Sequence, residues 1–132
     1  MSLRDFRRPR LWLGVWIFGW VLCVVLSLMP PVQLGGPPDS DKLGHFLAYF
    51  TLSAWAVQIF RTRRAQFVAA LSLILLGVAM EFAQATLTTT RLGDPYDALA
   101  NTLGVLAGFA LTFTPLAHAL YRLDHRGFHP VP

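Results

Sequence analysis

The sequence has few charged residues and a single cysteine. Charged residues occupy 14% of its 132 positions, whereas hydrophobic residues occupy 55%. A soluble domain of this length does not normally carry so much apolar surface, because a core of that size cannot remove it all from water. We therefore expect the chain to lie in a lipid bilayer. The one cysteine, Cys23, excludes an intrachain disulfide and does not indicate the redox compartment.

The basic residues do not form a continuous surface. A formal net charge of +4 would suggest nucleic acid if the lysines and arginines followed one face. They occur instead in short clusters beside apolar stretches, which is the pattern that sets the orientation of a membrane protein. We predict no nucleic-acid partner and expect membrane lipids to surround the chain.

Four apolar stretches are long enough to be transmembrane helices, since a hydrocarbon core of roughly 30 Å requires about 20 helical residues. The first follows four arginines, but its apolar run exceeds the roughly 7–15 residues of a signal-peptide h-region, and no A-x-A cleavage pattern follows it. We expect a retained helix. The sequence thus predicts one domain over residues 1–132, an all-α transmembrane four-helix bundle with helices at about 11–29, 43–60, 67–87 and 95–117.

The distribution of basic residues predicts the orientation of these helices. Nine of the 11 Lys and Arg residues lie in the N-terminal segment, in the loop at 61–64 and in the C-terminal tail. The positive-inside rule then places both termini in the cytoplasm. The two outer loops carry only Lys42 and Arg91 as basic residues. They hold most of the acidic ones: Asp39, Asp41, Asp94 and Asp97.

Polar residues of the second and fourth predicted helices gather near the outer face. Asp41, His45 and Tyr49 are four residues apart and share one face of the second helix, with Lys42 beside them. Steps of three or four residues form one stripe on the fourth helix, which consists of Asp94, Asp97, Asn101, Gly104 and Gly108. Because the two glycines permit close approach of another helix, we expect the polar part of the stripe to face a neighbour.

The third predicted helix carries Glu81 and Gln84 on one face. An acid at the centre of a transmembrane helix costs on the order of 2.5–3.5 kcal/mol on insertion scales, and less near the interface. Such a group normally faces the bundle interior with a partner. The available cationic partners of Glu81 are Lys42, His45 and Arg91.

Several of these residues also have a purely structural interpretation. The run Asp94-Pro95-Tyr96-Asp97 has the pattern of a helix start, with Asp94 as N-cap, Pro95 at N1 and Asp97 at N3. His45 would equally fit a neutral histidine that bonds a backbone carbonyl, and Glu81 would fit a structural ion pair. The sequence leaves these alternatives open.

Taken in order, these residues resemble a known family. The resemblance is carried by three blocks: Asp41-Lys42-x-x-His45-Phe46-x-x-Tyr49, Glu81-x-x-Gln84, and Arg91-x-x-Asp94-x-x-Asp97-x-x-x-Asn101-x-x-Gly104. Together they are similar to the VanZ-like family of bacterial membrane proteins, over about residues 41–108. The resemblance implies a small multi-pass protein of the bacterial cytoplasmic membrane and cell envelope. The family is named for a member linked to resistance to the glycopeptide antibiotic teicoplanin.

We expect a polar site at the extracytoplasmic end that binds or processes an anionic or glycosylated envelope molecule, such as a lipid-linked precursor or a glycopeptide. The candidate catalytic residues are His45, Glu81 and Asp97. The candidate ligand-binding residues are Asp41, Lys42, Tyr49, Gln84, Arg91 and Asn101. We expect no cofactor and no metal, because no recognised ligand spacing is present. A His45, Glu81 and Asp97 set is nevertheless of the kind that binds zinc.

Other function classes fit the same residues. A membrane-embedded enzyme would use His45 with Glu81 or Asp97 as an acid/base pair on a lipid headgroup. A structural or helper subunit of an envelope complex would use the polar groups only to lock the helices together. Transport by a monomer is disfavoured, because the cytoplasmic halves of the predicted helices are almost wholly apolar.

Overall fold

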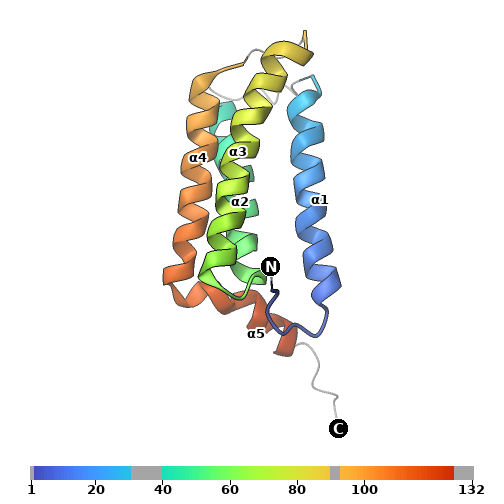
Figure 1. The fold of residues 1–132 in the computed structure, drawn as a ribbon, viewed down its shortest axis with the longest axis vertical. Coiled ribbons are helices and arrows are strands. Elements are labelled where there is room, and N and C mark those ends of the chain that lie inside the picture. Colours follow the sequence, from blue (N-terminus) through green and yellow to red (C-terminus); the bar gives the residue numbers. More distant parts are fainter. Residues whose placement is uncertain (1, 31–39, 90–92, 127–132) are drawn as a thin grey trace.

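The computed structural model describes residues 2–30, 40–89 and 93–126. These residues form an all-helical fold, as predicted, with no strand and one isolated antiparallel bridge between Leu3 and Phe60. The elements in chain order are α1 (Pro9–Leu28), α2 (Ser40–Ile59), α3 (Arg63–Leu87), α4 (Pro95–Phe109), the 3-10 turns η1 (Ala110–Phe113) and η2 (Pro115–His118), and α5 (Ala119–Arg126). The four long helices run along the long axis, and α5 crosses the end at which α1 begins (Figure 1).

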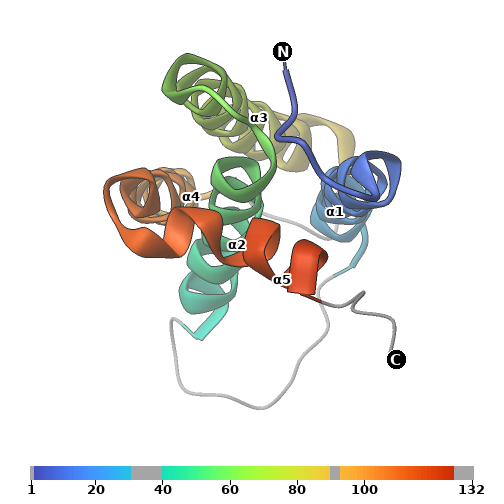
Figure 2. The ribbon, with the colours of Figure 1, turned by 90° about the horizontal axis from the view of Figure 1, so that it is seen from below.

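The central helix of this arrangement is α2. It contacts α1, α3, α4 and α5, and it lies between α1 and α4 in the view along the bundle axis (Figure 2). In contrast, α1 is peripheral, and none of its residues is fully buried. The helices that surround α2 therefore present most of the apolar outer surface.

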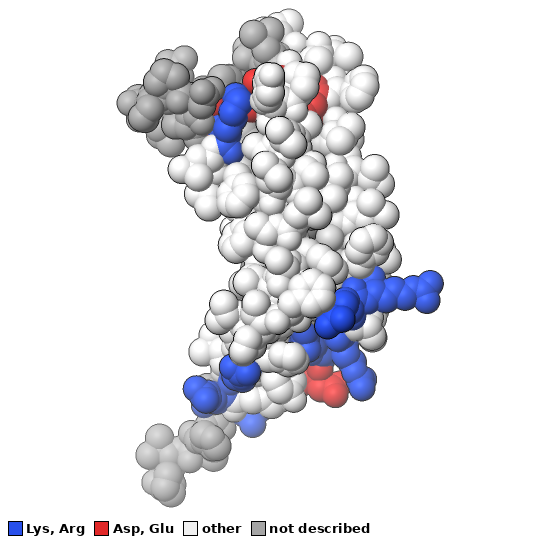
Figure 3. Space-filling model, turned by 90° about the vertical axis from the view of Figure 1, so that its left-hand side faces the viewer, with Lys and Arg blue, Asp and Glu red and all other residues white. Residues whose placement is uncertain are grey.

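Three helical segments of the described chain are long and apolar enough to cross a membrane: Pro9–Leu28, Arg63–Leu87 and Pro95–Phe113. Their large apolar side chains are exposed, with Phe18 at 65% and Phe82 at 70%. In the space-filling view, a middle zone without charge separates two charged ends (Figure 3). A membrane protein is indicated, because water would not tolerate so large an apolar surface.

The second predicted span, α2, does not reach the same apolarity. Asp41, Lys42 and His45 lie in its first two turns, and Gln58 lies at its other end. Because neighbouring helices cover α2 on several sides, it needs less apolar surface than a helix that faces lipid. The predicted apolar spans are thus confirmed for three of the four helices.

The predicted helix starts need correction at three places. The first helix begins at Pro9 instead of residue 11, because proline suits the first helical position. The second begins at Ser40 instead of residue 43. The third begins at Arg63 instead of residue 67, since the Thr62 side chain accepts a hydrogen bond from the Ala65 N–H at 3.1 Å and caps the helix.

The prediction of a continuous fourth helix over residues 95–117 is wrong in its last part. The α-helical hydrogen bonding of α4 ends at Phe109, and a 3-10 turn carries the chain on to Phe113. Thr114 is extended, with φ −121° and ψ 160°. The cause is Pro115, which lacks an N–H and pushes the preceding residue out of the helical region. The predicted polar tail forms α5 instead.

The end of the molecule that holds α5 is fastened by polar contacts to the segment before α1. Asp124 accepts hydrogen bonds from the backbone N–H of Arg7 at 2.5 Å and from Trp12 Nε1 at 3.0 Å. Arg4 Nε donates to the carbonyl oxygen of Gln58 at 3.0 Å. These contacts close one end of the bundle over a core cluster of Phe6, Ala56, Ile59, Phe60, Ala65, Ala69 and Leu120.

The backbones of α2 and α4 lie in direct contact. A Cβ added to Gly108 would be 2.7 Å from the carbonyl oxygen of Phe50. Nearby, Ser53 Oγ donates to the carbonyl oxygen of Val105 at 2.7 Å. The close approach predicted for the glycine stripe is therefore confirmed, and the partner is α2. This packing fixes the register between the polar residues of the two helices.

Candidate functional site

Polar side chains from three helices meet at the end of the bundle opposite α5. α2 supplies Asp41, Lys42, His45 and Tyr49; α3 supplies Glu81 and Gln84; Asp94, Asp97 and Asn101 come from the start and first turns of α4. The structure brings together the predicted site residues, apart from Arg91, which lies outside the described residues. Their predicted catalytic and ligand-binding roles remain predictions.

The first turn of α4 is built around Asp94. Its Oδ1 accepts a hydrogen bond from the Tyr96 N–H at 2.9 Å, and Pro95 occupies the first helical position, as the predicted helix start requires. The pKa of Asp94 is lowered from its ordinary value, first by the hydrogen bond from the Tyr96 N–H and then by Lys42. Lys42 Nζ lies 3.2 Å from Asp94 Oδ2. Asp94 is therefore a cap with a fixed negative charge.

His45 is held between two residues of α4. Its Nδ1 lies 3.1 Å from Asn101 Oδ1, and its Nε2 lies 3.6 Å from Asp97 Oδ2. With Asn101 Oδ1 as the acceptor, Nδ1 carries the proton, and in the neutral ring Nε2 presents a lone pair toward Asp97. The alternative in which His45 bonds a backbone carbonyl is not the arrangement observed.

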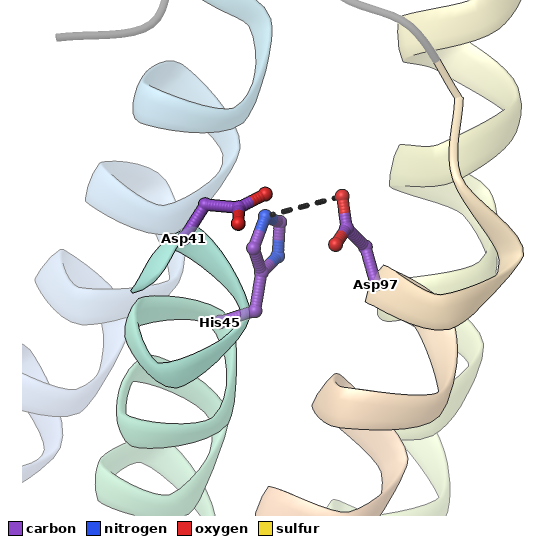
Figure 4. A group of neighbouring side chains, drawn as sticks. All are labelled: Asp41, His45 and Asp97. Atoms are coloured by element: carbon purple, nitrogen blue, oxygen red, sulfur yellow. Dashed lines mark ion pairs between the residues drawn. The ribbon is translucent and has the colours of Figure 1, made fainter. Parts of the chain in front are cut away.

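Asp97 is the most enclosed carboxylate of this end. It is only 6% exposed, and its Oδ1 has no hydrogen-bond partner among the described residues. Lys42 Nζ lies 3.6 Å from that oxygen, beyond hydrogen-bond distance, and is closer to Asp94. The helix-start interpretation does not account for this side chain, since its carboxylate points across to α2 (Figure 4).

Glu81 is buried and joins α3 to the start of α4. Its Oε2 accepts a hydrogen bond from the Asp94 backbone N–H at 2.8 Å. Its Oε1 has no hydrogen-bond partner within the described part of the chain. The sequence predicts Lys42, His45 or Arg91 as partners of Glu81, whereas the hydrogen-bond partner in the structure is a backbone N–H. One oxygen of this acid thus has a structural role, and the other is available.

Gln84 and Tyr49 are both almost fully buried between the helices. Gln84 Nε2 donates to the carbonyl oxygen of Ser27 at 2.8 Å, which connects α3 to the last turn of α1. Tyr49 lies one helical turn below His45, against Gly77 of α3. Gln84 therefore holds α1 in place, while its side chain also lines the cleft described next.

A cleft of about 240 Å³ opens between α1, α2 and α3 at this end. Its lining combines polar and small groups: Cys23, Leu26, Ser27, Asp41, Gly44, His45, Ala48, Tyr49 and Gln84. Four of these were predicted as site residues, namely Asp41, His45, Tyr49 and Gln84, whereas the α1 residues were not predicted. Ser27 offered a signal, because it is a hydroxyl residue within the apolar run of α1, at the depth of Gln84.

A second hollow of about 320 Å³ runs along α1 and α2 toward the middle of the bundle. Its lining is almost wholly apolar: Gly19, Leu22, Cys23, Leu26, Leu47, Ala48, Thr51 and Leu52. It shares Cys23, Leu26 and Ala48 with the polar cleft. The two hollows therefore adjoin along α1 and α2, with the polar one at the end of the molecule and the apolar one along its side.

The described charges at this end are predominantly negative, and Figure 3 shows acidic and basic side chains next to one another there. Lys42 is the one described cation among four carboxylates: Asp41, Glu81, Asp94 and Asp97.

Comparison of the chain with family models, with curated proteins and with solved structures gave no match. The geometry of the site is therefore the basis for the function of the protein.

Proposed function

We propose that the protein is a multi-pass membrane protein that binds an envelope lipid in the two hollows along α1 and α2. The headgroup occupies the polar cleft beside Asp41, His45 and Gln84, and an acyl chain lies in the apolar groove. The observation that carries this proposal is that the polar cleft and the apolar hollow lie side by side and share Cys23, Leu26 and Ala48. A ligand with a polar end and an apolar tail matches both parts, whereas a small soluble ligand matches only the cleft.

The chemistry of the cleft favours a hydroxyl-rich headgroup over a bare anion. Carboxylate, amide and imidazole groups line it, and such groups bond sugar hydroxyls as donors and acceptors. An unaccompanied phosphate in the cleft would meet the carboxylate of Asp41 at close range, which costs free energy at low local dielectric. Of the anionic and glycosylated ligands expected from the sequence, the glycosylated class is the better fit.

The proposal includes an orientation. The end with α5 carries the arginines of the N-terminal segment, of the α2–α3 loop and of α5, and the positive-inside rule assigns such an end to the cytoplasm. All four long helices then cross the membrane, with α2 as the shielded fourth span. The cleft opens at the extracytoplasmic surface, where envelope lipids are exposed. The sequence resemblance to the VanZ-like family is compatible with this assignment and with a relation to glycopeptide resistance.

Native mass spectrometry of the purified protein tests lipid binding. The chosen variant is Ala48→Phe, because Ala48 lines both the cleft and the groove. Its matched control is Ala79→Phe, at an exposed position of α3 that lines neither hollow. We expect a glycolipid to co-purify with the wild type and with Ala79→Phe but not with Ala48→Phe. Equal lipid occupancy in all three proteins would refute the proposal.

An acid/base reaction on the bound headgroup is the second candidate. It is favoured by one observation: His45 lines the cleft, and Asn101 orients its ring through Nδ1 at 3.1 Å. Nε2, 3.6 Å from Asp97 Oδ2, is then the nitrogen that would take a proton as a general base. Incubation with envelope lipids and product analysis by mass spectrometry tests it. Turnover by the wild type that is lost in His45→Gln supports catalysis; lipid binding without products leaves binding as the function.

A further inference from the structure

We propose that Asp41, His45 and Asp97 form a binding site for a divalent transition-metal ion, with zinc as the best-fitting ion. One ligand atom from each residue lies within 4.8 Å of the others. The three side chains point toward a common space from α2 and α4 (Figure 4). The set differs from the one considered from sequence, because Asp41 takes the place of Glu81, whose Oε2 is engaged by the Asp94 N–H.

The distances are close to those that a zinc ion requires. Zn–N and Zn–O bonds of about 2.0–2.2 Å in a tetrahedron separate neighbouring ligand atoms by about 3.3–3.6 Å. His45 Nε2 and Asp97 Oδ2 are 3.6 Å apart, so these two need almost no movement. Asp41 is exposed, and its carboxylate is free to rotate inward and complete the set. A fourth position would remain open toward the cleft that Asp41 and His45 line.

The buried carboxylate of Asp97 is an independent indication of a missing ligand. Its Oδ2 faces His45 Nε2 at 3.6 Å, whereas the second oxygen of the same carboxylate, Oδ1, is buried without a hydrogen-bond partner among the described residues. A buried charge normally has partners that satisfy it. Lys42 Nζ at 3.6 Å gives only a long ion pair. A cation bound at Oδ2 would offset the buried charge of the whole Asp97 carboxylate, and Lys42 would keep its shorter contact with Asp94 at 3.2 Å.

The environment of His45 also suits a metal ligand. Asn101 Oδ1 accepts from Nδ1 at 3.1 Å, which orients the ring and leaves the Nε2 lone pair directed at Asp97. Metal-binding histidines are usually fixed by such a bond from the second nitrogen. Without a proton or a cation between them, the Nε2 lone pair and the Asp97 carboxylate would be two acceptors facing each other.

The balance of charge supports a cation at this position. Two carboxylates and a neutral imidazole bind Zn²⁺ with no residual charge, in place of an acidic cluster that Lys42 alone offsets among the described residues. The metal site goes beyond the proposed lipid function and does not depend on it. If both hold, the open coordination position would accept an oxygen of the headgroup, and a phosphate would become an acceptable part of the ligand.

Metal titration of the purified, EDTA-treated protein in detergent tests the proposal. We expect one Zn²⁺ per chain by isothermal titration calorimetry, and Co²⁺ binding with the visible absorption bands of a four-coordinate site. Asp41→Asn should weaken binding at least tenfold, and His45→Gln and Asp97→Asn should abolish it. Asn101→Ala should weaken it about 10–100-fold, the usual effect of losing the group that orients a ligand.

A control makes the result decisive. His125→Gln, at the opposite end beside Asp124, should bind zinc as the wild type does. Asp41→Asn changes an exposed side chain and is not expected to disturb folding. The proposal is overturned if the wild type binds no stoichiometric zinc, if Asp41→Asn binds as tightly as the wild type, or if His125→Gln loses binding as His45→Gln does. Lipid retention measured in EDTA is a separate readout, so either proposal can fail without the other.

Discussion

Gly104 of α4 lies directly against the backbone carbonyl of Phe46 in α2, with no room for a side chain between them. This contact is one residue from His45 and one helical turn from Asn101, whose side chains are in contact at 3.1 Å. The distance between the two helix backbones therefore determines whether the histidine and the amide meet. The same packing positions Asp97, one turn nearer the helix start.

Substitution of Gly104 by alanine should separate α2 from α4. Overpacking of this kind typically costs about 1–3 kcal/mol, and the cost here falls on backbone atoms, which cannot move aside. We expect a lower unfolding temperature in detergent and weaker zinc and lipid binding for Gly104→Ala.

Gly14 of α1 provides the matched control, because a Cβ added there has no atom within 4 Å. Gly14→Ala should be neutral or stabilising by up to about 1 kcal/mol, since alanine is the better helix former. Equal destabilisation by both substitutions would contradict the close-packing argument.

Replacement of Glu81 separates its structural from its chemical role. Glu81→Gln keeps an oxygen that can accept the Asp94 N–H, whereas Glu81→Ala leaves that N–H unsatisfied, at a cost of about 1–3 kcal/mol. We expect thermal unfolding in detergent to show near-wild-type stability for Glu81→Gln and a clear loss for Glu81→Ala.

Lipid retention and turnover by Glu81→Gln then show whether the carboxylate of Glu81 is needed for function. A stable variant without lipid retention or turnover assigns the carboxylate to the site. A stable variant with full function limits Glu81 to its bond with the α4 start. Similar destabilisation of both variants would mean that the negative charge itself holds the helix.

The helices and the meeting of polar residues could be predicted from sequence because helical spacing carries that information. Asp41 and His45 share a face by their separation of four, and the Asp97 and Asn101 stripe follows from the same period. The glycines of α4 indicated a close helix neighbour. The shared faces and the glycine stripe follow from spacing within one helix, so they can be predicted without knowing which helices are adjacent.

Other features depended on tertiary contacts that spacing does not contain. The bond from the Asp94 N–H to Glu81 joins a side chain to a backbone group 13 residues away. The cleft needs α1, which supplies Ser27 and Cys23, and α1 is held by tertiary contacts such as the bond from Gln84 to the Ser27 carbonyl. The central position of α2 likewise follows from packing, and it explains why the helix is less apolar than the others. The end of α4, by contrast, depends on a local feature of the sequence, because Pro115 by itself indicates that the helix stops before it.

Cysteine labelling tests the proposed orientation. In a Cys23→Ala background, Thr89→Cys lies at the site end and Arg64→Cys at the opposite end, and both positions are exposed. A membrane-impermeant maleimide added to intact cells should label Thr89→Cys. It should label Arg64→Cys only after permeabilisation, since the arginine-rich end is assigned to the cytoplasm. Labelling of Arg64→Cys in intact cells would reverse the topology and place the cleft on the cytoplasmic side.

Stability at low pH should report the charge on Asp94. The pKa of Asp94 in the folded protein is lowered from its ordinary value of 3.8, first by the Tyr96 N–H and then by Lys42. A lowered pKa means that the ionised form favours folding. This contribution is complete above the ordinary pKa and is lost as the pH falls through the lower, folded-state value.

The comparison of Asp94→Asn with the wild type isolates that contribution. Asparagine is also a good N-cap, so the variant keeps the bond to the Tyr96 N–H but loses the charge and its attraction to Lys42 at 3.2 Å. The wild type should have the higher unfolding temperature at pH 7 and 5, and the difference should shrink toward pH 3. Asp94→Ala, which lacks the cap as well, should remain less stable than Asp94→Asn at every pH. A wild-type advantage that is constant from pH 7 to pH 3 would show that the ionisation of Asp94 does not stabilise the start of α4.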